Sequence, residues 1–270
     1  MQAQIKATVG VNFKFYRRNR LLLATFFLVL LVIGLSTIPS FFFLTNSQHL
    51  SIITKVSSQL SGIATIITPV LGLILISHHL GNRSAKMVFT KPCPPEAWLL
   101  ASSLSAAAVA AVFYAEIFVI CSFLFVAWGI PFQWGLVYVL LNDLAHALIW
   151  LGYLSFLAVV FHPVVAVLAV LIFQEGTFYG LKLLLTSCIK AAGAAHYAVF
   201  LHGAKWVVSA LYLLVPVTSP FEEKNGQVYK TLRGTDADWP ALLATWGYAL
   251  AVSGLFFLLA NFFLKRKRLI

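Results

Sequence analysis

Charge is scarce in this chain of 270 residues: eight acids and 19 lysines and arginines make up only 10% of it, whereas 61% of its residues are hydrophobic. Ordinary soluble domains carry about 25% charged residues, so this composition excludes a typical soluble fold. The three cysteines have no metal-ligand spacing and predict neither a disulfide framework nor a zinc site. Together with a mean hydropathy of +0.92, these features predict an all-α integral membrane protein.

Familiar catalytic motifs are missing as well. The chain has no GxxxxGK[ST] loop, so we expect it not to hydrolyse ATP itself. It has no HExxH or GxSxG, and His78 and His79 lack the spacing of a metal site, so no metal or other cofactor is expected. With no internal repeat and no soluble domain, residues 1–270 are predicted to form a single transmembrane domain that is not an enzyme.

Long apolar runs are what the sequence does contain. A membrane-spanning helix needs roughly 20 mainly apolar residues. We predict six spans, at 21–44, 60–77, 98–128, 136–161, 163–185 and 241–264. Region 186–240 is predicted to be extracytoplasmic, with external or re-entrant helices before the last span. Residues 191–217 could instead form a seventh span, although two histidines and Lys205 interrupt that run.

The basic residues predict the orientation. Five precede Leu21, three lie within 83–91 and four form the KRKR tail at 265–268, so these groups hold 12 of the 19. An even number of spans places all three groups on one side, and basic flanks remain cytoplasmic. We therefore expect an inner (cytoplasmic) membrane protein with both termini cytoplasmic. Its net charge of +11 would face anionic membrane lipid, and we expect no nucleic acid partner.

Residues 5–18, before the first span, have the pattern of an amphipathic helix lying in the membrane interface. One face carries Ile5, Val9, Phe13 and Tyr16, and the neighbouring face carries Lys6, Lys14 and Arg17.

Three acids fall inside predicted spans: Glu116, Asp143 and Glu175. A carboxylate in hydrocarbon is costly, so such residues normally face the bundle interior or a wet cavity. His146 follows Asp143 by three positions and shares its helical face. This pair could form a proton relay or a hydrogen-bonded contact that orders the helices.

The segment between the second and third spans has a distinct order: GNRSAKMVFT, then KPCPP, then EAWLLASSLSA. This order resembles the first cytoplasmic loop of ABC type-2 permeases, the membrane subunits of ATP-binding-cassette exporters, in which a short coupling helix precedes a proline-containing turn. The amphipathic leader is similar to that family's connecting helix. The six-span topology and SALYLLVPVTSPFE, residues 209–222, also resemble the family.

The resemblance implies a permease that exports or extracts a substrate with energy from two ATPase subunits, which would bind ATP and magnesium. A second permease subunit would pair with it as a homodimer or heterodimer. The cytoplasmic loop 78–97 would contact the ATPase through Arg83, Lys86, Met87, Phe89, Lys91, Pro92 and Glu96. Spans two and five would line the pathway with Thr65, Thr68, Glu175, Thr177 and Tyr179. Proline fixes φ and limits slack, which suits a loop that transmits motion.

Two alternatives remain from the residues themselves. A proton-coupled secondary transporter could use Asp143, His146 and Glu175 as a proton path, although paired broken helices or repeats would be expected in it. A membrane assembly subunit that transports nothing is the other.

Overall fold

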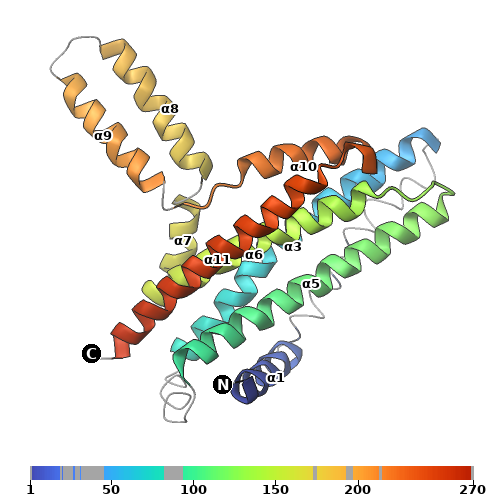
Figure 1. Cartoon of the computed structure of the whole chain (residues 1–270), viewed down its shortest axis with the longest axis horizontal. Coiled ribbons are helices and arrows are strands. Elements are labelled where there is room, and N and C mark those ends of the chain that lie inside the picture. Colours follow the sequence, from blue (N-terminus) through green and yellow to red (C-terminus); the bar gives the residue numbers. More distant parts are fainter. Residues whose placement is uncertain are drawn as a thin grey trace.

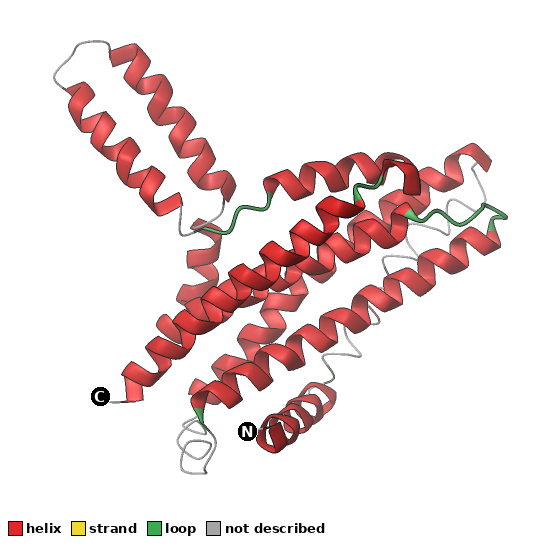
Figure 2. Cartoon of the chain, in the orientation of Figure 1, coloured by secondary structure: helices red, strands yellow, loops and turns green. Residues whose placement is uncertain are grey.

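The structure is a computed structural model, and it describes residues 2–18, 20, 27, 31, 46–81, 94–172, 175–192, 197–212 and 215–268. Every regular element within these ranges is a helix (Figure 2). The α-helices are α1 (Gln2–Arg18), α3 (Asn46–Gly81), α5 (Pro95–Ala127), α6 (Gly135–Val160), α7 (Pro163–Ile172), α8 (Glu175–Ala192), α9 (Tyr197–Tyr212), α10 (Ser219–Thr231) and α11 (Trp239–Arg268), and a short 3-10 helix, η1, spans Gly234–Asp236. The predicted all-α fold is thus confirmed over these ranges.

Among the residues that the structure describes, four helices are long and apolar enough to cross a membrane: His49–Ser77 within α3, Glu96–Ala127 within α5, Gly135–Val160 (α6) and Trp239–Arg266 within α11. The third, fourth and sixth predicted spans match α5, α6 and α11 closely. The predicted second span is only part of α3, which begins at Asn46 rather than at residue 60. Apart from residues 27 and 31, the predicted first span at 21–44 lies outside the described residues.

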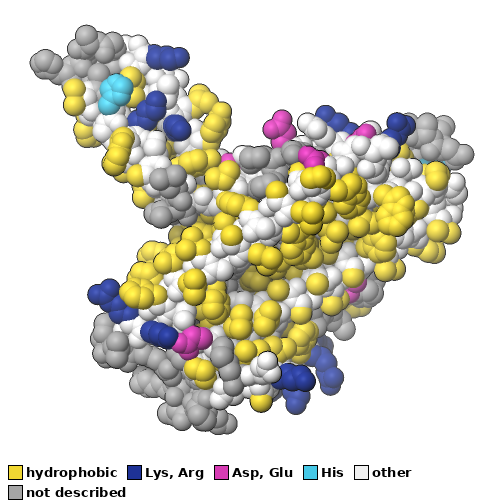
Figure 3. All heavy atoms as spheres, viewed as in Figure 1, with side chains coloured by type: hydrophobic (Ala, Val, Ile, Leu, Met, Phe, Trp, Pro, Cys, Tyr) yellow, Lys and Arg dark blue, Asp and Glu magenta, His cyan; other side chains and the backbone are white. Residues whose placement is uncertain are grey.

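Helix α6 is the centre of the bundle and packs against α3, α5 and α11 (Figure 1). Most of its side chains are buried, including Tyr138, Ile149 and Leu157. The core beside it is built from aliphatic and aromatic side chains of α3, α5 and α11. Many large apolar side chains around this core are exposed, and Figure 3 shows apolar side chains covering much of the visible face.

Helices α6 and α11 run parallel. Tyr138 packs edge-to-face on Trp239 near the start of both helices, with ring centroids 5.7 Å apart. Near the ends of both helices, the ring centroids of Phe156 and Phe263 are 6.0 Å apart. Because two parallel neighbours need a crossover connection, the chain between Val160 and Trp239 must return from one end of the bundle to the other.

That connection differs from the predicted fifth span. Over the described part of residues 163–185, the chain forms α7, which ends at Ile172, and α8, which begins at Glu175. Neither is among the helices that can cross a membrane by length and composition. At the start of α8, the carboxylate of Glu175 accepts hydrogen bonds from the first backbone amides of α10.

Helices α8 and α9 pack on each other and project away from the bundle as a hairpin (Figure 1). Large apolar side chains on this hairpin are exposed, among them Leu184, Phe200 and Trp206. The alternative seventh span at 191–217 corresponds to α9, which has 16 residues.

Helix α1 lies against α5. Asn12 donates a hydrogen bond from Nδ2 to the Ser105 hydroxyl at 3.1 Å, and the Tyr16 hydroxyl donates one to the Leu71 carbonyl at 3.2 Å. Both Asn12 and Tyr16 are fully buried, whereas Lys14 and Arg17 are exposed. Phe13 packs on the core cluster. The amphipathic pattern therefore reflects a helix that docks one face on the bundle.

Candidate functional site

The Asp143 carboxylate lies at the centre of a polar cluster between α3, α6 and α10. Ser61 of α3 and the Asn225 side-chain amide of α10 each donate a hydrogen bond to it. The Tyr229 hydroxyl donates a third, at 2.7 Å. Buried carboxylates need such partners, because an unpaired charge in an apolar interior is costly. Through Asp143, hydrogen bonds therefore connect α10 with both α3 and α6.

Helix α10 reaches this position because polar and apolar residues share the face that it packs against the bundle. Asn225 and Tyr229 are four residues apart and so lie on one face. Val228 and the following Leu232 are buried in the core. Leu232 ends the helix with a left-handed φ of 51°, and its carbonyl accepts a hydrogen bond from the Gly135 amide at 2.9 Å. A side chain at position 135 would collide with the Leu232 backbone, so this close approach requires glycine.

The protonation of Tyr229 suits its role as a donor. Burial raises the pKa of this phenol well above its ordinary value, and the adjacent Asp143 carboxylate raises it further. The hydroxyl therefore keeps its proton and can donate to Asp143 throughout the physiological range.

An open pocket of about 360 Å³ adjoins the cluster, and we call it the acidic pocket. Its charged lining consists of Asp143 and Glu222. The remaining lining residues are Ser58, Gly62, Thr65, His146, Asn225, Gly226 and Tyr229. Thr65 also shares a hydrogen bond of 2.7 Å with the Tyr114 hydroxyl of α5.

Glu175 is connected to this pocket through Thr218. The Glu175 carboxylate accepts hydrogen bonds from the backbone amides of Thr218 at 2.6 Å and Ser219 at 2.9 Å, and from the Tyr212 hydroxyl at 3.2 Å. These amides open α10, where free N–H groups and the helix dipole favour an anion. The Thr218 hydroxyl then donates to Glu222 at 2.9 Å. One polar network thus runs from Glu175 to the wall of the acidic pocket.

The structure distributes the predicted polar residues over different places. Thr65, Asp143 and His146 line the acidic pocket. Asp143 accepts hydrogen bonds from Ser61, Asn225 and Tyr229, none of which was predicted as its partner.

The other predicted lining residues lie apart from the acidic pocket. Thr68 is buried and donates to the Ala64 carbonyl of its own helix at 2.7 Å. Thr177 and Tyr179 are exposed on α8. Glu116 lies on α5 outside the cluster, and its Oε2 has no hydrogen-bond partner among the described residues. The structure therefore does not gather the predicted pathway residues of spans two and five into one lining.

Most of the predicted coupling residues lie outside the described residues: Arg83, Lys86, Met87, Phe89, Lys91 and Pro92. Glu96 is described, at the start of α5, where it forms an ion pair with Lys265 near the end of α11. This pair places the end of the predicted loop beside the basic C-terminal residues.

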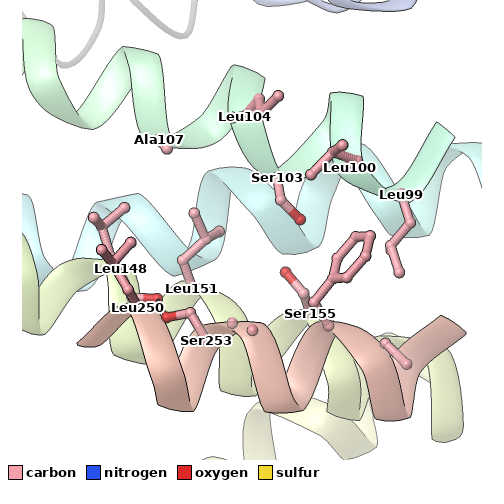
Figure 4. Close-up of a pocket in the computed structure, with 14 residues that line it drawn as sticks. Leu99, Leu100, Ser103, Leu104, Ala107, Leu148, Leu151, Ser155, Leu250 and Ser253 are labelled. Atoms are coloured by element: carbon pink, nitrogen blue, oxygen red, sulfur yellow. Dashed lines mark hydrogen bonds between the residues drawn. The ribbon is translucent and has the colours of Figure 1, made fainter. Parts of the chain in front are cut away.

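A second cavity of about 340 Å³ lies between α5, α6 and α11 (Figure 4). Leu99, Leu104, Leu148, Leu151 and Leu250 line it, with the hydroxyls of Ser103, Ser155 and Ser253 as its polar groups. No charged residue lines it, so its surface suits hydrocarbon better than a charged ligand.

Sequence reasoning missed Ser61, Asn225 and Tyr229. The segment from Ser219 to Thr231 reads as a polar loop when only its hydropathy is considered. Its spacing carried a signal, since Glu222, Asn225, Gly226 and Tyr229 recur at the intervals of one helical face.

Chemically, the site provides hydrogen-bond acceptors for a ligand: the carboxylates of Asp143 and Glu222 and the side-chain amide oxygen of Asn225. Comparison of the chain with protein-family models, curated proteins and solved structures finds no match.

Proposed function

We propose that the chain is the transmembrane permease subunit of an ABC exporter, in which a separate ATPase subunit supplies the energy. The observation that carries the proposal is the convergence of three helix ends. Ile76 near the end of α3, Trp98 near the start of α5 and Leu264 near the end of α11 share one core cluster. The basic segment 82–93 therefore starts and finishes at the same end of the bundle as the basic C-terminal residues.

Positive flanks favour the cytoplasmic side, so this end would face the cytoplasm of an inner-membrane protein. The parallel arrangement of α6 and α11 supports an even number of crossings, because one crossover must separate them. Residues 21–44 would supply the first crossing, and the connection that begins with α7 would supply the fifth. Both termini would then be cytoplasmic.

Energy would enter through the segment between α3 and α5. Closure of two ATPase subunits on ATP would push residues 82–91, and α3 and α5 would tilt together because they pack along their length. Helix α1, docked on α5 and bonded to Leu71 of α3, would move with them. A second permease subunit, identical or similar, would complete the pathway.

The proposal is tested by purifying the full chain from its native membrane with its associated proteins. We expect an ATPase to co-purify and its activity to depend on this subunit. Alanine at Arg83, Lys86 and Lys91 together should lower the coupled ATPase activity by about tenfold or more while the complex still assembles, as expected if about 1.4 kcal/mol of coupling is lost. Alanine at Lys182 and Lys190, two lysines on the distant α8, is the matched control.

Full assembly and full coupled activity in the triple variant would refute the coupling role. Absence of any ATPase partner would refute the proposed function itself. The part-buried, hydrogen-bonded Asp143 favours one rival, a proton-coupled secondary transporter. In proteoliposomes, that rival predicts transport that persists without ATP and stops when the proton gradient is collapsed.

A further inference from the structure

A second open pocket, which we call the basic pocket, adjoins the acidic pocket along α3 and α10. It has a volume of about 430 Å³, and its charged lining residues are Lys55 and Lys230. The two pockets share Ser58, Gly226 and Tyr229 as lining residues. They therefore form one continuous groove, the bipolar groove, with carboxylates at one end and ammonium groups at the other.

The acidic end has more acceptors than donors. Asp143 and Glu222 line it without any lysine or arginine, and His146 is the only other titratable side chain there besides Tyr229. The Asn225 side chain is 4% exposed and donates through Nδ2 to Asp143. Its Oδ1 is buried and accepts no hydrogen bond within the described part of the chain. A buried acceptor without a donor is costly, so this end is suited to a ligand that brings N–H groups.

A metal ion fits the acidic end poorly. Within the described ranges, no three His, Cys, Asp or Glu residues come together as ion ligands. An organic ammonium needs no such set, because each of its N–H groups can point at a separate oxygen.

The basic end has the opposite character. Lys55 and Lys230 are exposed, and in the ranges that the structure covers neither forms an ion pair. Two ammonium groups directed at one pocket favour an anion between them, such as a carboxylate or phosphate.

The distance between the acidic end and the basic end of the groove follows from the rise of the two helices that line it. On α3, Lys55 precedes Ser61, which bonds Asp143, by six residues, which is about 9 Å of helix rise. On α10, Asn225 precedes Lys230 by five residues, which is about 7.5 Å of rise. Both helices therefore separate the acidic and basic ends by roughly 8 Å. The groove is open at Gly226, which lines both pockets, because a Cβ added there would meet no atom within 4 Å.

We propose that the bipolar groove binds a flexible zwitterion whose ammonium lies at Asp143 and Glu222 and whose anion lies at Lys55 and Lys230. Ligands of this chemistry include an ω-amino acid and a short peptide with free termini. The inference concerns binding, and it stands whether or not the chain works with an ATPase.

The test measures binding to the purified full chain in lipid nanodiscs, with empty nanodiscs as the blank. The probes are 6-aminohexanoate, hexylamine, which lacks the anion, and hexanoate, which lacks the ammonium. We expect 6-aminohexanoate to bind at least about tenfold more tightly than either single-charge probe, since each charged contact is worth roughly 1.5–3 kcal/mol. Dialanine and dialanine amide form a second pair that distinguishes a peptide from an amino acid as the source of the chemistry.

Variants assign each end of the ligand. Changing both Lys55→Gln and Lys230→Gln should weaken 6-aminohexanoate binding about tenfold and leave hexylamine binding unchanged. Gly226→Leu should abolish binding of every probe by filling the groove. Its matched control is Gly180→Leu on α8, where a Cβ also meets no atom within 4 Å.

Equal affinities for 6-aminohexanoate and hexylamine, or undiminished binding by Gly226→Leu, would overturn the proposal. The proposal would also be overturned if neither 6-aminohexanoate nor dialanine bound to protein whose circular dichroism spectrum shows that it is folded. Preferential binding of dialanine over 6-aminohexanoate would support the groove and assign it to peptide termini.

Discussion

Gly152 of α6 lies directly against Ser253 of α11. A Cβ atom at position 152 would stand 2.9 Å from the Ser253 Cα and 3.1 Å from its Cβ. At the same crossing, the Ser253 hydroxyl donates a hydrogen bond to the Leu148 carbonyl at 2.9 Å. Small residues let helix backbones approach closely in membranes, where dispersion and hydrogen bonds drive association. The absent side chain at position 152 therefore sets the spacing of the two parallel helices.

Gly152→Ala should destabilise the bundle by about 1–3 kcal/mol, because the added methyl group meets backbone atoms that cannot rotate away. The measurement is thermal unfolding of the purified protein in detergent. Gly254→Ala is the matched control, since a Cβ at that position meets nothing within 4 Å. Equal melting temperatures for the two variants would contradict the close approach.

Tyr229→Phe should loosen α10 from the bundle. The substitution removes one of three donors to Asp143, and a hydrogen bond to a charged group contributes about 1.5–3 kcal/mol. We expect faster amide hydrogen exchange across Ser219–Thr231 with little change in α5. Tyr179→Phe, at an exposed position on α8, should have no such effect. Unaltered exchange in α10 would show that Asn225 and the apolar contacts hold it without the phenol.

Glu175→Ala should release the start of α10. Its carboxylate accepts the Thr218 and Ser219 amides, and the structure gives α10 no capping bond from its own N-cap side chain. Loss of a helix cap costs about 0.5–2 kcal/mol. Hydrogen exchange at residues 217–222 should increase, whereas Glu223→Ala, an exposed acid one turn into the helix, should leave it unchanged. Identical hydrogen exchange in the two variants would show that Glu175 does not cap the start of α10.

Tyr16→Phe should weaken the docking of α1. The hydroxyl is buried and donates to the Leu71 carbonyl, so its loss costs about 1 kcal/mol. Limited proteolysis within residues 2–18 should become faster. Val11→Ala serves as the control, because Val11 is more than half exposed on the opposite side. Unchanged proteolysis would mean that α1 is held by its other contacts, such as that of Asn12 with Ser105.

Hydropathy predicted α5, α6 and α11 to within a few residues, because each is a continuous apolar segment whose helical state is required by the membrane. It placed the start of α3 at residue 60, since the preceding turns carry Lys55, Gln59 and several serines. Those turns are nevertheless helical because their other face packs Ile53 and Val56 into the core. Hydropathy averaged over consecutive residues does not detect a helix in which only one face is apolar and buried.

The polar cluster was beyond sequence reasoning for a different reason. Asp143 was singled out because an acid in an apolar run stands out. Its partners Ser61 and Asn225 are each 82 residues away along the chain, and nothing local connects them. The contact of Glu175 with the start of α10 is hidden from the sequence in the same way, because its partners lie more than 40 positions later.

The Asp143 cluster also has a consequence for the order in which the chain is made. Ser61 is already synthesised when Asp143 leaves the ribosome, but Asn225 follows 82 residues later. At about 5–20 residues per second, this delay is roughly 4–16 s. During that interval the nascent carboxylate has only the Ser61 hydroxyl of its three eventual donors. In a chain that stalls before α10, the Asp143 carboxylate therefore lies between the helices without its donors from Asn225 and Tyr229. Such a chain differs from the completed protein in the hydrogen bonding of one acid.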